Sequence, residues 1–171
     1  MAQERILLEH GFGPFVRPDS RLLILGSFPS VKSRDVQFYY GHPQNRFWRV
    51  LAALCGEETP RSREEKERLL AAHHIALYDV IERCSIIGSS DSSIDDVLVT
   101  DLMPLLAVSE IGTNIFVNGA KAHQLYMKYT FPLLGLPAVK LPSTSPANAA
   151  FSLERLTREW RALLPPLKND V

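Results

Sequence analysis

An unbroken apolar run at residues 22–25 (Leu-Leu-Ile-Leu) constrains the fold more than any other feature of the sequence. A run without polar alternation is typical of a parallel strand that is covered on both faces. Gly26 ends the run, and Pro29 cannot continue it as an interior strand residue. The run therefore predicts an α/β protein with helices on both sides of a sheet.

Further strands and helices alternate along the chain. Strands are predicted at residues 75–81, 114–118 and 137–141, with a polar loop at 88–93. Helices are predicted at residues 2–10, 46–56, 62–72, 101–106, 120–129 and 153–163, the last ended by Pro165 and Pro166. This order predicts a three-layer α/β/α sandwich around a central parallel sheet of about four strands.

The bulk composition narrows the class of protein. A chain of 171 residues predicts one domain over residues 1–171, with a core at about 20–164. Equal numbers of acidic and basic residues, 19 each, argue against a non-specific DNA coat protein. They do not exclude a locally basic entrance to an active site. Candidates for it are Lys32, Arg34, Arg46 and Arg49.

Cysteine and hydropathy patterns bear on location and cofactors. Cys55 and Cys84 are too few for a four-thiolate cluster and suit a reducing cytosol. No secretory signal or run of about 20 apolar residues is seen, so the expectation is a cytoplasmic protein, nucleoid-associated if bacterial, without a membrane partner. His73 and His74 are adjacent and lack a third ligand at suitable spacing, so no metal is expected.

The predicted strands are each followed by a loop that carries polar residues. These loops cover residues 27–45, 79–93, 118–121 and 142–148. In open α/β sheets, ligands bind in the crevice outside the carboxyl ends of the strands. The sequence therefore predicts that these four loops share one functional rim.

Three segments in these loops resemble a known enzyme family. They are GSFPS at residues 26–30, YYGHPQNRFW at 39–48 and LPSTSPANA at 141–149. Together they resemble the uracil-DNA glycosylase superfamily, and within it the hypoxanthine-DNA (deoxyinosine) glycosylase family most; mismatch-specific uracil-DNA glycosylases share a similar HPxNRFW segment. The resemblance covers residues 22–163. It implies hydrolysis of the N-glycosidic bond of a flipped, damaged base, without metal or organic cofactor.

The chain departs from the superfamily at two catalytic positions. Residues 26–30 lack the Asp, Asn or Glu that positions water in many members, and Leu141 stands where classical members place a His. The resemblance implies that Asn45, in the HPxN segment, is the catalytic residue. An amide can orient water or donate to an oxygen, which suffices for an electrophilic sugar cation. The competing interpretation is that Asn45 caps the following helix.

The resemblance also implies a base pocket and a DNA-binding surface. Phe28 and Tyr40 have rings suited to stacking on a base, and Asp79 can accept from N1–H of hypoxanthine or from N3–H of uracil. The residues expected to bind the base are Gly26, Ser27, Phe28, Tyr40, His42, Asp79 and Asn118. Each has a structural alternative, namely core packing for the rings, turns for the small residues, and an ion pair or helix cap for Asp79.

The residues expected to bind DNA are Ser30, Lys32, Arg46, Ser143, Thr144 and Ser145. Small hydroxyl residues allow the phosphate backbone to approach closely. The loop at residues 144–148 would enter the duplex, with Pro146 or Asn148 as a modest plug. The alternative is a proline-stiffened loop without a partner.

The resemblance thus implies a base-excision repair enzyme that removes hypoxanthine from deoxyinosine in double- or single-stranded DNA, and we expect it to act as a monomer. No lysine in the motifs is placed as a Schiff-base nucleophile, so the enzyme is expected to be monofunctional. Two alternatives remain open. One is a mismatch-specific uracil or thymine glycosylase, and the other is a non-catalytic nucleotide- or DNA-binding α/β module.

Overall fold

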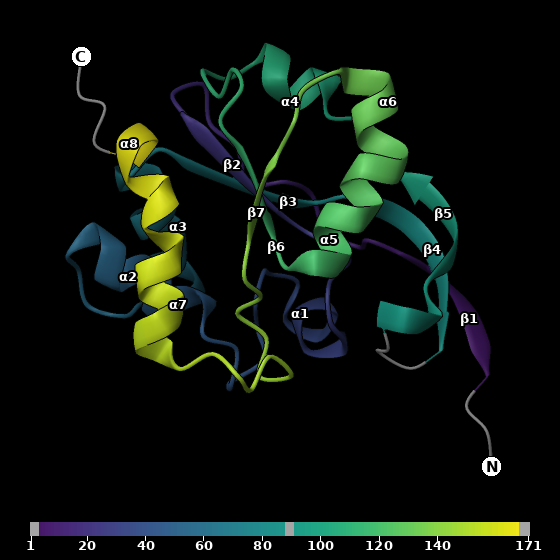
Figure 1. The fold of residues 1–171 in the computed structure, drawn as a ribbon, viewed down its shortest axis with the longest axis horizontal. Coiled ribbons are helices and arrows are strands. Elements are labelled where there is room, and N and C mark those ends of the chain that lie inside the picture. The colour runs from purple at the N-terminus through teal and green to yellow at the C-terminus, as the bar shows by residue number, and fades with distance from the viewer. Residues whose placement is uncertain (1–3, 88–90, 168–171) are drawn as a thin grey trace.

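The computed structural model describes residues 4–87 and 91–167, and a parallel four-stranded sheet lies at its centre (Figure 1). Its strands, in spatial order, are β3 (Ile75–Asp79), β2 (Leu22–Gly26), β6 (Ile115–Asn118) and β7 (Val139–Leu141). Every residue of β2 is buried, and β2 pairs with β3 and β6 on its two edges. The predicted parallel sheet is confirmed, and burial on both faces explains the unbroken apolar run.

Helices follow most of the strands. In chain order they are α1 (Val31–Val36), α2 (Phe47–Cys55), α3 (Arg63–Ala72), α4 (Met103–Ala107), α5 (Ala120–Leu125), a π-helical segment (Tyr126–Thr130), α6 (Phe131–Leu134), α7 (Leu153–Glu159), a 3₁₀-helix (Trp160–Leu163) and α8 (Leu164–Leu167). Figure 1 shows α2, α7 and α8 on one side of the sheet and α5 and α6 on the other. The predicted capping box before α3 is present at Ser62 and Glu65.

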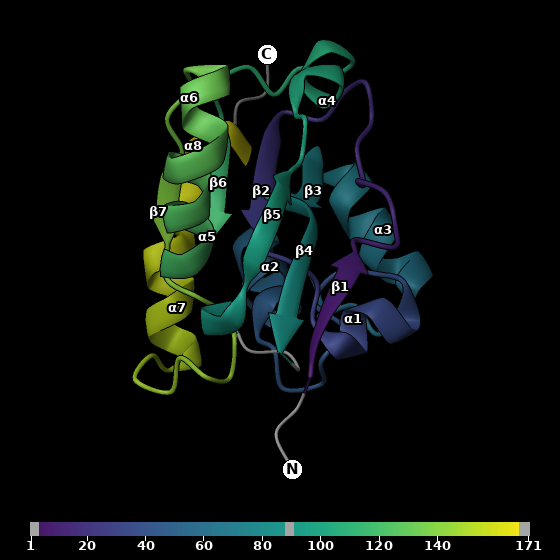
Figure 2. The same cartoon turned by 90° about the vertical axis from the view of Figure 1, so that its right-hand side faces the viewer.

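A second, antiparallel sheet was not predicted. It consists of β1 (Arg5–Glu9), β4 (Ile81–Ile87) and β5 (Asp95–Val99), in the order β1-β4-β5. Figure 2 shows this sheet on the same side as α5 and α6, so one outer layer of the sandwich is partly β. The other outer layer is helical, as expected.

Two helix predictions are wrong, one in the type of element and one in where the helix ends. The helix at residues 2–10 is replaced by strand β1, because pairing with β4 outweighs the weak helical preference of so short a segment; residues 2 and 3 lie outside the described part. The last helix also does not end at Pro165, since α8 begins at Leu164 and a proline is tolerated in a first turn. Of the polar loop at 88–93, residues 91–93 form a 3₁₀ turn and residues 88–90 are not described.

The two sheets meet at the carboxyl ends of β2 and β3. The chain passes from β3 into β4 through Val80, whose N–H donates to the Gly26 carbonyl at 2.8 Å. On the other side of β4, the His10 N–H donates to the Glu82 carbonyl at 2.8 Å and extends the pairing of β1. This junction brings residues of the N-terminal strand beside the end of β3.

Candidate active site

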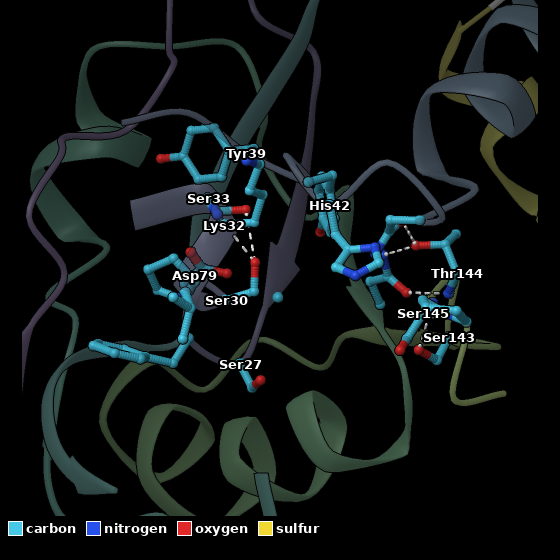
Figure 3. A pocket seen from close by; sticks show the side chains of 18 of the residues that line it. Ser27, Ser30, Lys32, Ser33, Tyr39, His42, Asp79, Ser143, Thr144 and Ser145 are labelled. Carbon is cyan, nitrogen blue, oxygen red and sulfur yellow. Dashed lines mark hydrogen bonds between the residues drawn. The ribbon is translucent and has the colours of Figure 1, made fainter. Parts of the chain in front are cut away.

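A cavity of about 320 Å³ opens among the loops that follow β2, β3, β6 and β7. Figure 3 shows Asp79, Tyr39, Ser33 and Lys32 on one side of this cavity and His42, Thr144, Ser143 and Ser145 on the other. All residues expected to bind the base line it, as do Asn45 and the expected DNA-binding residues other than Arg46. The strand ends therefore gather at one rim, as the topology of the sheet requires.

The Asn45 side of the cavity, here called the amide wall, is a chain of hydrogen bonds between neutral groups. Asn118 Oδ1 accepts from the Thr144 N–H at 3.1 Å, and Asn118 Nδ2 donates to Thr144 Oγ1 at 3.0 Å. Thr144 Oγ1 then donates to Asn45 Oδ1 at 2.8 Å. Thr144 is fully buried, so its hydroxyl serves this chain inside the protein.

Backbone groups fix the direction of every bond in the amide wall. Asn45 Oδ1 also accepts from the Phe47 N–H at 3.0 Å, and a backbone N–H can only donate. The same argument, applied to the Thr144 N–H, orients the Asn118 amide. Asn45 Oδ1 therefore holds two donors, and Asn45 Nδ2 makes no hydrogen bond with the described residues while the side chain lines the cavity.

This geometry combines two interpretations of Asn45 that were expected to compete. Asn45 Oδ1 satisfies the first N–H of α2, which is a capping interaction, and the residue still borders the cavity. An amide whose oxygen receives two hydrogen bonds is polarised, which strengthens its N–H groups as donors. What Asn45 offers to a ligand is therefore a donor rather than an acceptor.

The opposite side, here called the carboxylate wall, is built around Asp79. The side chain is 5% exposed at the end of β3, beside Gly26 of β2 in the sheet register. A Cβ atom on Gly26 would lie 2.5 Å from Asp79 Oδ1 and 3.4 Å from the Tyr40 hydroxyl. A side chain at position 26 would therefore force the carboxylate to shift, because the carboxylate and the phenol approach the β2 backbone so closely.

His10 holds the other oxygen of this carboxylate. Its Nε2 lies 2.7 Å from Asp79 Oδ2, and both side chains are buried. Asp79 Oδ1 makes no hydrogen bond with the described residues and faces the cavity that Asp79 lines. The carboxylate wall therefore presents one free acceptor to the cavity.

Two tyrosines complete this wall. Burial, and then the nearby Asp79 charge, raise the pKa of both Tyr39 and Tyr40 well above the usual range; the neighbouring Asn118 amide lowers that of Tyr40 by less. Both phenols are therefore neutral at physiological pH. The Tyr40 backbone has φ 51°, a left-handed conformation that is uncommon outside glycine, and one face of its ring stacks on Phe47 at 3.9 Å.

Arg46 lies outside the cavity and holds the loop at residues 142–151, here called the late loop. Its guanidinium donates to the carbonyls of Phe151, Ser145 and Asn148, and its own N–H donates to the Thr144 carbonyl. These donors all serve the protein backbone. Arg46 thus shapes the loop at residues 142–151, which forms part of the cavity rim.

The remaining expected residues lie at the mouth. Lys32 and His42 are exposed, and His42 Nδ1 accepts from the Gln44 N–H at 3.1 Å. Ser30 caps α1 by accepting from the Ser33 N–H, and Ser143 and Ser145 accept from backbone N–H groups within their own loop. Phe28, in contrast, is buried behind the mouth, and its ring makes a T-shaped contact with the His10 ring.

Sequence reasoning missed His10 as a site residue. His10 falls in the predicted helix at residues 2–10, whereas the structure brings its side chain to Asp79, which lies 69 positions further along the chain. The absence of an alternating pattern in residues 5–9 left no local signal of a strand that ends at the site. Among the described residues, no cluster of three or more His, Cys, Asp or Glu is arranged to hold a metal ion, and no helix is long and apolar enough to cross a membrane.

Comparisons with known proteins agree with this geometry. The family model of the uracil DNA glycosylase superfamily matches residues 14–164. A protein from Methanosarcina acetivorans named hypoxanthine DNA glycosylase is 36% identical over 161 residues, which cover 92% of this chain and 98% of that protein. One of the same name from Methanosarcina barkeri is 33% identical over 116 residues, or 67% of this chain and 73% of that protein.

A solved structure supports the same assignment. It is a solution NMR structure from Methanosarcina acetivorans, described as that of a candidate uracil DNA glycosylase. It matches with a TM-score of 0.77 and 34% identity, covering 96% of this chain and 100% of that chain. The family match over residues 14–164 shows that the chain belongs to the uracil DNA glycosylase superfamily, and the strand order and the cavity at the strand ends agree with it.

Proposed function

We propose that this protein is a DNA glycosylase that removes hypoxanthine from deoxyinosine. The observation that carries the proposal is a cavity with one free carboxylate oxygen, from Asp79, opposite the free amide donor of Asn45. The names of two relatives point to the same base. Membership of the superfamily implies DNA as the partner.

In this proposal the damaged nucleotide leaves the stack and its base enters the cavity. The C1′–N9 bond breaks with both electrons going to the purine, which takes up a proton, and a water oxygen bonds to C1′. The products are free hypoxanthine and an abasic sugar. Because the sugar carries cationic character in the transition state, the water needs positioning more than deprotonation.

Asn45 is the proposed catalytic residue. With Oδ1 held by Phe47 and Thr144, its Nδ2 donates to one lone pair of the water and leaves the other directed at C1′. Thr144 and Asn118 act behind Asn45 by fixing its orientation. A strong base is absent from this proposal, in keeping with the neutral character of the amide wall.

Asp79 is the proposed reader of the base. An ionised carboxylate accepts from N1–H of hypoxanthine, and Phe28 and Tyr40 enclose the ring with Gly26, Ser27, His42 and Asn118. Uracil, too, presents an N–H donor, at N3, so a uracil-removing activity is the principal rival outcome. Tyr40 contributes its neutral hydroxyl, since one face of its ring is covered by Phe47.

The DNA strand is proposed to cross the mouth of the cavity. Exposed Lys32 supplies a positive charge, and Ser30, Ser143 and Ser145 allow close approach of phosphates. Pro146 is exposed at the tip of the late loop and is the candidate plug beside the flipped nucleotide. We propose that the protein acts as a monomer, because one copy of the chain brings Asn45, Asp79 and Asn118 together in one cavity.

The test is excision from matched duplexes that contain a single inosine, uracil, xanthine or abasic site. We expect inosine to be the preferred substrate, with strand breakage only after alkaline treatment of the abasic product. Equal or greater activity on uracil would favour the mismatch-uracil alternative. Binding without any base release would favour the non-catalytic alternative, and breakage without alkali would contradict a monofunctional enzyme.

A further inference from the structure

A buried histidine outside the three motifs, His10, contacts the Asp79 carboxylate. His10 is 1% exposed, and its Nε2 contacts Asp79 Oδ2 at 2.7 Å. It comes from the loop after β1, so the antiparallel sheet carries it to the parallel one. Among the described residues, His10 is the one whose side chain hydrogen-bonds to the Asp79 carboxylate.

Hydrogen-bond accounting defines the tautomer of His10. His10 Nε2 has a partner, Asp79 Oδ2. His10 Nδ1 is buried and has no hydrogen-bond partner among the described residues. A proton on Nδ1 would be a buried donor without an acceptor, which is unfavourable. The geometry therefore favours a neutral ring with its proton on Nε2.

The surroundings of His10 reinforce this assignment. Four aromatic rings enclose it at centroid distances from 4.5 to 6.2 Å, namely Phe12, Tyr78, Tyr39 and Phe28. This apolar surrounding suits an Nδ1 atom that carries no proton. Meanwhile Nε2–H supplies the hydrogen bond that the buried Asp79 carboxylate receives from a described side chain. The pair is thus a neutral donor holding an anion.

We propose that His10 is a positioning residue that keeps Asp79 ionised and thereby makes the cavity select 6-oxopurines over adenine. The inference rests on the proposed function. Hypoxanthine carries a hydrogen at N1, whereas N1 of adenine is a lone pair. A carboxylate oxygen attracts the first and repels the second, but a protonated carboxyl group donates to adenine N1 and loses this discrimination. Normal adenine is therefore excluded only while Asp79 stays charged.

The other titratable groups near Asp79 do not supply this control. The phenols of Tyr39 and Tyr40 are neutral because burial raises their pKa. Tyr78 donates to Glu82 at 2.6 Å, so this pair is engaged with itself. Lys32 and His42 lie exposed at the mouth of the same cavity, and Arg34 lies over the Phe28 ring at 5.8 Å.

Two substitutions of similar size distinguish a hydrogen-bonding role of His10 from a packing role. His10→Gln retains an N–H that can reach Asp79, whereas His10→Met fills the space without a donor. The readout is inhibition of inosine release by free hypoxanthine and free adenine, measured from about pH 6 to about pH 8.5. A packing role would alter both inhibitors alike and would not change their ratio.

For the wild type and His10→Gln we expect hypoxanthine to inhibit at least about tenfold better than adenine throughout this range. For His10→Met we expect the ratio to fall towards one as the pH is lowered, because the unpaired carboxyl group takes up a proton. Equal ratios for the Gln and Met variants at every pH would overturn the inference. Thermal melting of each variant checks that it is folded at the assay temperature.

A measurement on the unmodified protein covers the case in which the Met variant does not fold. Nitrogen-15 NMR of the histidine rings is expected to show His10 as a neutral Nε2–H tautomer between about pH 6 and about pH 8. A doubly protonated His10 in that range would overturn the inference. Failure of the wild type to release inosine would instead contradict the proposed function, while the NMR result would still decide the state of His10.

Discussion

The two walls of the cavity hold their polar groups in different ways. In the amide wall, Asn118, Thr144 and Asn45 are neutral and form a directional chain that ends in a free N–H donor. In the carboxylate wall, one buried anion, Asp79, is held by one buried histidine and presents a free acceptor. In the proposed function, a flipped base between the two walls would meet a donor on one side and an acceptor on the other.

The difference teaches how one small cavity can separate two tasks. A neutral donor can steady a water near a cationic sugar without competing with it electrostatically. A fixed anion can distinguish an N–H from a lone pair on the base edge. We therefore expect substitutions in the amide wall to change the rate of bond cleavage, and substitutions in the carboxylate wall to change which base is accepted.

Substitution of Asn45 tests this division between the walls most directly, because it has the largest expected effect. Asn45→Ala is expected to lower inosine release by about 10²–10³-fold, the usual loss for one well-placed donor. Asn45→Asp keeps an oxygen for the Phe47 N–H but removes the donor, so it should lose similar activity without a fall in melting temperature. Single-turnover excision and thermal melting measure both. Near-normal activity of the Asp variant would show that Asn45 acts through its oxygen.

Asp79→Asn tests the opposite wall. His10 Nε2–H should take the new amide oxygen, which turns the NH₂ group into the cavity where Asp79 Oδ1 now lies. We expect inosine release to fall by about 10–10²-fold and free adenine to become a better inhibitor than hypoxanthine. Competition assays with the two free bases measure this reversal. A uniform loss of affinity for both bases would contradict the assignment of Asp79 as the reader.

Gly26→Ala probes how tightly the carboxylate wall is fitted. The added methyl group would meet Asp79 Oδ1 at 2.5 Å, so the carboxylate must shift. We expect inosine release to fall on the order of tenfold, with a loss of about 1–3 kcal/mol in the free energy of unfolding. Gly13→Ala is the control, because no described atom beyond its chain neighbours lies within 4 Å of the added Cβ. Equal effects of the two substitutions would mean that the fit at Gly26 is unimportant.

Thr144→Val gives the smallest expected effect on rate. It preserves shape while removing the hydroxyl that joins Asn118 Nδ2 to Asn45 Oδ1. We expect a roughly 3- to 10-fold loss of rate and a loss of about 1–3 kcal/mol in stability, since the half-buried Asn118 amide loses its acceptor. Thr157→Val removes an exposed hydroxyl that donates to the Leu153 carbonyl and serves as the control. An unchanged base preference in Thr144→Val would support the division between the walls.

Local sequence patterns accounted for most of the central sheet because β2 and β3 are wholly buried and β6 is nearly so. The apolar run of β2 and the segments of β3 and β6 were visible without any knowledge of their partners. The N-terminal strand was not, because a five-residue segment such as β1 forms only by pairing with β4. The same non-local pairing explains why the antiparallel sheet went unpredicted.

For the site, the sequence by itself determined which loops meet, because the carboxyl ends of parallel strands share one edge of the sheet. It did not determine which atoms of those loops remain free. Asn45 Oδ1 is occupied by a hydroxyl 99 positions away, and Asp79 Oδ2 by a histidine 69 positions away. Only the tertiary structure could decide this, because hydrogen-bond direction depends on the partner that folding brings within reach.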